Sequence, residues 1–113
     1  MTNKKIKIYQ TKTYLDSLND LGNTWRIAVE KKVNSLITNQ DIAKPMSYQH
    51  GGFCEIKVGS KYRVYCIRIE NSLVVAFVLG PVLDHDENYT KSKEYKKLFE
   101  RLEKIKEEFK DKI

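Results

Sequence analysis

The chain has 113 residues, a length that suits one domain and is too short for two independent hydrophobic cores. Hydrophobic residues make up 41% and charged residues 32%, and no window approaches the roughly 20 consecutive apolar residues that a membrane-spanning helix needs. The net charge of +6 attracts nucleic acid or an acidic protein, although lysines that only keep a protein soluble explain it equally well. We therefore expect one domain over residues 1–113, with no membrane contact.

The first part of the chain predicts a strand and two helices. Residues 5–10 alternate apolar and polar side chains, which is typical of a strand and unlike a signal peptide, so we expect a cytoplasmic protein. A helix capped near Thr11 or Thr13 should follow, and Gly22-Asn23-Thr24 should end it and start a second one. Apolar residues recur in both at helical spacing: Tyr14, Leu15, Leu18 and Leu21, then Trp25, Ala28, Val29, Val33, Leu36 and Ile37. The two helices form a hairpin, and residues 38–52, which lack a clear period, form a loop.

Three successive antiparallel strands are predicted in the middle of the chain. Residues 53–58, 62–69 and 72–79 are rich in β-branched and aromatic residues, with short turn segments between them. A three-residue loop over residues 59–61 sets the register of the first hairpin. Counting outward from that loop gives these partners: Val58 with Tyr62, Lys57 with Arg63, Glu55 with Tyr65, and Phe53 with Ile67.

This register decides which side chains share a face of the sheet, because side chains alternate along a strand. Lys57, Arg63, Glu55 and Tyr65 point to one side. The other side gathers an apolar set that suits a core: Ile56, Val58, Tyr62, Val64, Cys54 and Cys66. With a core on one face, we expect a polar platform on the other.

The two cysteines fall opposite each other in this register. A cross-strand disulfide between Cys54 and Cys66 is geometrically possible, but a reducing cytoplasm keeps them as thiols, and we expect two small buried apolar residues. Two cysteines and two histidines without paired ligand spacing predict no metal site, and no motif indicates a cofactor.

The end of the chain predicts a long charged helix, a C-terminal extension over residues 90–113. Its apolar residues step by three and four and form a narrow seam: Tyr95, Leu98, Leu102, Ile105 and Phe109. The seam fits docking on the domain, or contact with a second copy or another partner, and both remain open. The predicted fold class is α+β: an N-terminal strand, a helical hairpin, a three-stranded antiparallel meander and a long C-terminal helix.

This order resembles the RelE/ParE superfamily of bacterial toxins, and several motifs sharpen the likeness. Lys44-Pro45-Met46 precedes Gly51-Gly52-Phe53, the alternating strand Glu55-Ile56-Lys57-Val58-Gly59 follows, and Tyr62-Arg63-Val64-Tyr65 opens the middle strand. The family pattern is similar: a Lys-Pro-Leu segment, a glycine-aromatic step, an alternating strand and a Tyr-Arg-aliphatic strand. The likeness covers residues 5–89.

Ribonucleases of that superfamily enter the ribosomal A site and cut messenger RNA with residues on an exposed sheet face. The resemblance implies that Arg63 is the catalytic or phosphate-holding arginine, that Lys57 is a basic residue on the neighbouring strand, and that Tyr89 lies against the substrate. It also implies a cognate antitoxin as partner, and the +6 charge favours an acidic one. The expected function is a toxin that inhibits translation as a ribosome-dependent mRNA endoribonuclease.

The chain departs from the family pattern just past the last strand. Family ribonucleases often carry a further arginine or histidine there, whereas this chain has Pro81-Val82-Leu83-Asp84-His85-Asp86. His85 is the candidate replacement, because an imidazole exchanges protons near neutral pH. Without it the site lacks a good general acid or base, and two alternatives gain: a ParE-like inhibitor of DNA gyrase that cuts no RNA, or a protein- or nucleic-acid-binding module of the same fold.

RNA cleavage by the 2′-hydroxyl needs a base, a cation for the charged phosphorane and an acid for the leaving oxygen. Arg63 and Lys57 suit the cation role. Glu55 is either the base or only the counter-ion of these two cations. Four further residues are candidates for binding RNA, three through phosphates and one by stacking on a base: Lys31, Lys32, Lys61 and Tyr65. Solvated lysines, and a tyrosine that fills a gap on the sheet, are the simpler explanation of these four.

Overall fold

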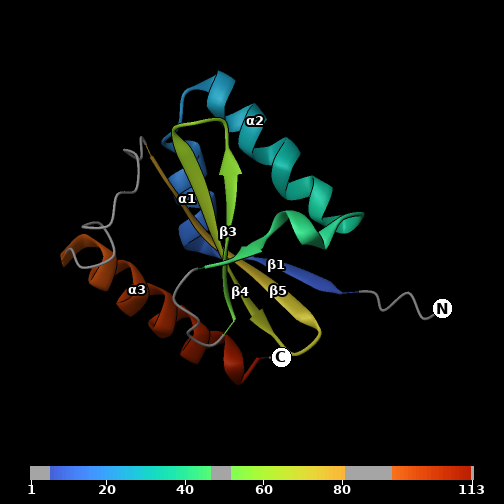
Figure 1. Cartoon of the computed structure of the whole chain (residues 1–113), viewed down its shortest axis with the longest axis vertical. Coiled ribbons are helices and arrows are strands. Elements are labelled where there is room, and N and C mark those ends of the chain that lie inside the picture. The colour runs from blue at the N-terminus through green and yellow to red at the C-terminus, as the bar shows by residue number, and fades with distance from the viewer. Residues whose placement is uncertain (1–5, 47–51, 81–92, 113) are drawn as a thin grey trace.

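The computed structural model describes residues 6–46, 52–80 and 93–112 (Figure 1). Its elements, in chain order, are β1 (Lys7–Gln10), α1 (Lys12–Asn19), α2 (Asn23–Asn34), the short 3-10 helices η1 (Ser35–Ile37) and η2 (Gln40–Ile42), β2 (Lys44–Pro45), β3 (Phe53–Val58), β4 (Tyr62–Ile69), β5 (Ser72–Leu79) and α3 (Lys93–Lys110). The strands form one sheet in the order β1-β5-β4-β3-β2. This is the predicted α+β class.

The predicted meander and its register are confirmed. β3 pairs with β4 so that Lys57 lies opposite Arg63 and Glu55 opposite Tyr65. β1 joins the far side of β5 as a parallel strand, and the short β2 pairs with the outer edge of β3. The prediction of a loop over residues 38–52 was wrong in part, because η2 and β2 lie within its described residues. Arg68 holds this segment on the sheet, since its Nη2 donates to the carbonyls of Gln40 at 3.0 Å and Ala43 at 3.3 Å.

Thr11 joins β1 to α1 and also forms a hydrogen bond to a bulge in β5. Its hydroxyl oxygen accepts from the Tyr14 N–H at 2.9 Å, which makes Thr11 the N-cap of α1. The same hydroxyl donates to the carbonyl of Ala76. Tyr65 pairs with Phe77 while Cys66 pairs with Val75, so Ala76 is the extra residue of a β-bulge. The cap therefore satisfies a carbonyl that the bulge removes from the sheet ladder.

The α1–α2 hairpin covers one face of the sheet, as Figure 1 shows. The core on this side includes the predicted apolar residues of the strands and of both helices: Tyr14, Leu18, Val29, Val33, Leu36, Cys54, Ile56, Val58, Val64 and Cys66. Both cysteines are buried thiols. Two residues of the predicted helical stripes are exposed instead, Leu15 by 44% and Ile37 by 74%. Leu15 is rotated about 100° from the buried Tyr14, and Ile37 follows the end of α2, where the 3-10 geometry of η1 changes the facing direction.

The opposite face is a second core, so the prediction of a polar platform there was wrong over much of its area. Helix α3 packs on this face through Leu98, Leu102 and Ile105, against a set of sheet residues that includes Phe53, Tyr65, Ile67, Val74 and Phe77. The cause lies in β5, an uninterrupted apolar run that needs cover on both sides. Of the two arrangements predicted for the last helix, docking on the domain is the one observed. The Tyr95 side chain lies outside the described residues. Within the described ranges, no helix is both long and apolar enough to cross a membrane.

Candidate active site

Three charged side chains stand together on the α3 side of the sheet, near the β3–β4 turn. Lys57 and Arg63 are direct partners across the two strands, and Glu55 is two residues from Lys57 on the same strand. Lys57 is exposed, whereas the side chains of Arg63 and Glu55 retain 15% and 18% exposure. The sequence predicted this grouping, and we call Glu55, Lys57 and Arg63 the charged cluster.

Arg63 and Glu55 form a hydrogen-bonded ion pair. The Arg63 Nη1 donates to the Glu55 Oε2 at 3.2 Å, diagonally across the two strands. Two cations directly opposite each other destabilise a strand pair, and the carboxylate offsets that repulsion. Two positive charges and one negative charge leave the cluster with a formal charge of +1, so it attracts an anion. The arginine fork, already oriented by Glu55, suits the oxygens of a phosphate.

Two apolar residues of β5, Leu79 and Phe77, lie next to the charged cluster on the same face of the sheet. Arg63 pairs with Leu79, and the next pair on the same face is Tyr65 with Phe77. The Arg101 guanidinium of α3 lies 4.2 Å from the centre of the Phe77 ring, a cation–π contact. Sequence reasoning did not single out Arg101. The position of Arg101 in the sequence could have indicated a contact with the sheet, because a residue between Leu98 and Leu102 borders the apolar seam by which α3 docks.

The other predicted site residues are dispersed. Tyr65 is fully buried beneath α3, with its ring 5.5 Å from that of Phe77, so no base stacks on it in this structure and it fills the sheet instead. Lys61 is exposed in the β3–β4 turn. Lys31 and Lys32 are exposed on α2, on the opposite side of the sheet from the charged cluster. The predicted roles of His85 and Tyr89 fall on residues outside the described ranges.

The thiols are unsuited to nucleophilic chemistry. Burial raises the pKa of Cys66 far above its ordinary value, and burial also raises the pKa of Cys54, against the opposing charge and hydrogen bond of Arg68. Both side chains belong to the core under α1 and α2. Among the described residues, no group of three or more His, Cys, Asp and Glu side chains is arranged to hold a metal ion.

Several solved structures share this architecture, whereas no family model and no curated protein matches the chain. The isolated RelE toxin of E. coli gives a TM-score of 0.57 at 20% identity, covering 86% of this chain and 98% of that chain. The RelBE2 toxin–antitoxin complex of Mycobacterium tuberculosis gives 0.57 at 19% identity, covering 67% and 98%. The RelB–RelE complex of Methanococcus jannaschii gives 0.53 at 15% identity, covering 64% and 88%. The chain has a RelE-like fold, as its motifs predicted.

Proposed function

We propose that this chain is the toxin of a toxin–antitoxin pair and that it inhibits translation by cutting messenger RNA on the ribosome. The observation that carries the proposal is the charged cluster. The Arg63 Nη1 donates to the Glu55 Oε2 at 3.2 Å, and Lys57 lies directly opposite Arg63 on the neighbouring strand. A RelE-like fold supports it, since the solved structures that the chain resembles include a RelE toxin and complexes of such toxins with antitoxins.

In the proposed reaction the 2′-hydroxyl oxygen attacks the adjacent phosphorus, and the bond from phosphorus to the 5′-oxygen breaks. The products are a 2′,3′-cyclic phosphate and a 5′-hydroxyl. Glu55 accepts the proton of the attacking hydroxyl, and His85 donates a proton to the leaving oxygen. Arg63 and Lys57 stabilise the extra negative charge that the phosphorane oxygens gain in the transition state. Tyr89 is assigned a contact with the substrate from the family resemblance alone.

Arg101 completes the cationic side of this site. Family ribonucleases often have another basic residue just past the last strand, and this chain has an acidic segment there. The Arg101 guanidinium, seated on Phe77, lies one same-face residue pair from Arg63. We assign it a phosphate contact that neighbours the scissile one. Helix α3 is then part of the active site rather than only a cover over Tyr65.

The proposed partners are the ribosome with its mRNA and an antitoxin protein. The net charge of +6 favours an antitoxin segment rich in Asp and Glu, because complementary charge accelerates encounter and suppresses wrong partners. Lys61, exposed in the β3–β4 turn, would contact ribosomal RNA through its phosphates.

Induced expression followed by 5′-end mapping of cellular RNA tests the proposal. The unchanged chain should arrest growth and create new 5′-hydroxyl ends within translated messages. Arg63→Ala should reduce cleavage about 10³-fold, the scale expected when a preorganised transition-state donor is removed. Arg26→Ala is the matched control, since Arg26 lies on α2 and its Nε forms a surface ion pair with the Glu30 Oε1 at 3.7 Å. Equal loss in both variants would count against a role for the charged cluster.

Inhibition of DNA gyrase without RNA cleavage is the competing function. The burial of Tyr65 beneath α3 favours it, because a sheet face filled by a helix offers less room for a substrate strand. In the same expression experiment a gyrase inhibitor would leave the RNA ends unchanged and would induce a DNA-damage response. That result would replace the ribonuclease proposal.

A further inference from the structure

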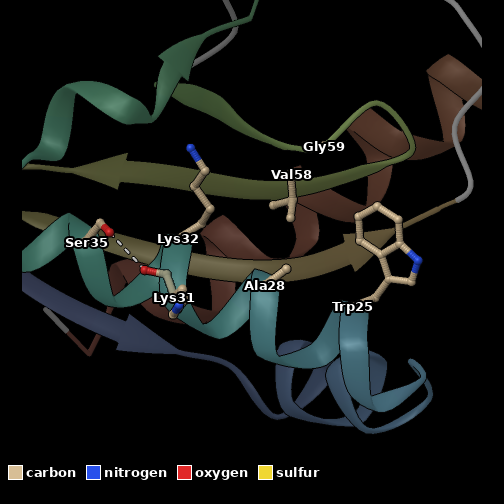
Figure 2. Close-up of a pocket in the computed structure, with 7 residues that line it drawn as sticks. All are labelled: Trp25, Ala28, Lys31, Lys32, Ser35, Val58 and Gly59. Carbon is tan, nitrogen blue, oxygen red and sulfur yellow. Dashed lines mark hydrogen bonds between the residues drawn. The ribbon is translucent and has the colours of Figure 1, made fainter.

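A groove opens on the side of the sheet opposite the charged cluster, between α2 and the end of β3 (Figure 2). Its volume is about 400 Å³, and its lining comes from α2 and the residue after it together with the end of β3: Trp25, Ala28, Lys31, Lys32, Ser35, Val58 and Gly59. Figure 2 shows the Trp25 indole at one end and the two lysines with Ser35 toward the other.

The apolar end of the groove is held in place by its neighbours. The Trp25 ring packs on Tyr62, with the ring centres 4.6 Å apart. The same indole lies against Gly59, where an added Cβ would come within 3.0 Å of two ring atoms. Gly59 also has φ +61°, a conformation that favours glycine. This wall is therefore preformed, and an apolar side chain entering the groove would meet a fixed surface.

The other end of the groove is positively charged. Lys31 and Lys32 are both exposed in the last turn of α2. The negative end of the helix dipole accounts for basic residues at that place, but it leaves two flexible ammonium groups beside an apolar wall. Along the same helix and η1, the apolar side chains of Ile27 and Ile37 are 55% and 74% exposed. Apolar surface interleaved with a few cations is the composition of a protein-binding site rather than of a track for a phosphate backbone.

We propose that this groove binds an acidic protein segment. The segment inserts one aliphatic or aromatic side chain between Trp25 and Val58 and places carboxylates against Lys31 and Lys32. The site lies on the other side of the sheet from Arg63 and Glu55, so its occupancy requires neither RNA cleavage nor any movement of α3. An antitoxin segment of the kind proposed above has this chemistry, but binding in the groove does not depend on RNA cleavage by the charged cluster.

Trp25 is the only tryptophan of the chain, so its fluorescence reports on the groove directly. Three synthetic 12-residue peptides without tryptophan serve as probes: one alternating Glu and Leu, one alternating Glu and Ser, and one alternating Lys and Leu. The Glu-Leu peptide should shift the Trp25 emission and bind at least tenfold more tightly than either of the others. Its affinity should fall severalfold between 50 mM and 500 mM salt, because the carboxylates act at the surface.

Charge reversal locates the binding site. The double variant Lys31→Glu/Lys32→Glu should lose about tenfold or more in affinity for the Glu-Leu peptide. Lys96→Glu/Lys97→Glu on α3 changes the net charge equally, at two exposed lysines of another surface, and should leave the affinity within twofold. Ala28→Leu, which fills part of the groove with a good helix former, should weaken binding without changing circular dichroism.

Three results would overturn the proposal. The first is equal or absent binding of the Glu-Leu and Glu-Ser peptides, which would show that no apolar anchor is accepted. The second is an equal effect of the two charge reversals, which would reduce the attraction to net charge. The third is a single-stranded RNA oligonucleotide that shifts the Trp25 emission at a lower concentration than the Glu-Leu peptide, which would make the groove a nucleic-acid surface.

Discussion

The two faces of the central sheet are both apolar, but helices from opposite ends of the chain cover them. On one face α1 and α2 follow directly after β1, and Thr11 ties their first turn to the bulge of β5. On the other face α3 docks as the last element, over the same strands. Helix α1 begins at Lys12, directly after β1 ends at Gln10. The segment that leads to α3 is longer, because β5 ends at Leu79 and α3 begins at Lys93.

The two faces also differ in how completely they are closed to solvent. The face under α1 and α2 is closed by fully buried residues such as Val29 and Leu36, and the groove between Trp25 and Ser35 is at its rim. The face under α3 combines a core with the partly exposed pair of Arg63 and Glu55. Charged groups that meet a substrate cannot be sealed into a core, and the proposed active site accordingly combines core residues with partly exposed charges.

The sharpest test of this division is Glu55→Gln. The amide keeps the shape and one acceptor for Arg63 but cannot take a proton, so cleavage should fall about 10³-fold, or about 4 kcal/mol of transition-state stabilisation. The temperature of unfolding should change little, because both partners of this ion pair remain partly exposed.

Glu30→Gln, at an exposed residue of α2, is the control for Glu55→Gln and should leave cleavage unchanged. Rates measured in a translating extract with a defined message decide the matter. If Glu55 only balances the charge of Arg63 and Lys57, the variant will cut RNA at the original rate or faster, since the cluster becomes more positive.

Equivalent truncations on the two faces should have different consequences. Leu36→Ala and Leu102→Ala each remove a side chain with no exposed surface, and each should cost about 3 kcal/mol through lost burial and the cavity left behind. For Leu36 the cost should appear in global unfolding. For Leu102 it should release α3 while the rest of the chain stays folded.

Hydrogen exchange by residue, together with chemical denaturation, distinguishes the two outcomes of these truncations. In Leu102→Ala, amides of α3 should exchange faster while those of β4 and β5 stay protected. Uniformly faster exchange across the sheet would mean that both faces belong to a single cooperative unit.

Tyr14 makes the α1–α2 face sensitive to alkaline pH. Burial, reinforced by the charges of Glu30 and Cys66, raises the pKa of Tyr14 from 10.0 to about 12. The folded chain therefore keeps a proton that the unfolded chain loses above pH 10, and the free energy of unfolding should fall between pH 10 and pH 12 by about 2 to 3 kcal/mol.

Denaturant titrations over this pH interval, with Tyr14→Phe for comparison, measure the effect. The variant should lose the part of the pH dependence that begins near pH 10, while the buried thiols, whose raised pKa values act in the same direction, keep their contribution from lower pH. A variant with an unchanged pH dependence would exclude Tyr14 as its source.

The strands and the charged cluster could be predicted from the sequence because they depend on local rules. Turn residues fixed the loop over residues 59–61, and a period of two then placed Lys57 and Arg63 together. The second core could have been anticipated from the unbroken apolar run of β5, which has no polar face to offer to solvent.

The remaining features depend on packing between distant segments, and the sequence pattern does not carry them. The carbonyl of Ala76 at the bulge accepts from Thr11, which is 65 residues away, and Arg68 donates to the carbonyls of Gln40 and Ala43 just before β2. The burial of Tyr65 and the placement of Arg101 both depend on where α3 docks. The apolar seam of α3 indicates that the helix docks on the sheet. It does not indicate which aromatic ring a neighbouring cation such as Arg101 contacts.

The smallest expected effect tests whether α3 contributes to the site or only covers the sheet. Arg101→Ala removes a cation–π contact at 4.2 Å from Phe77, which should lower stability by about 0.5 to 1 kcal/mol and reduce RNA cleavage about fivefold. Lys106→Ala is the matched control, because its ammonium lies 5.8 Å from the Phe53 ring. Phe53 is one same-face residue pair further from Arg63 along the sheet than Phe77, which Arg101 contacts. Lys106→Ala should change cleavage by less than twofold. Cleavage that rises in Arg101→Ala would instead show that α3 obstructs the charged cluster, since loosening the helix would then expose the site more than the lost cation weakens it.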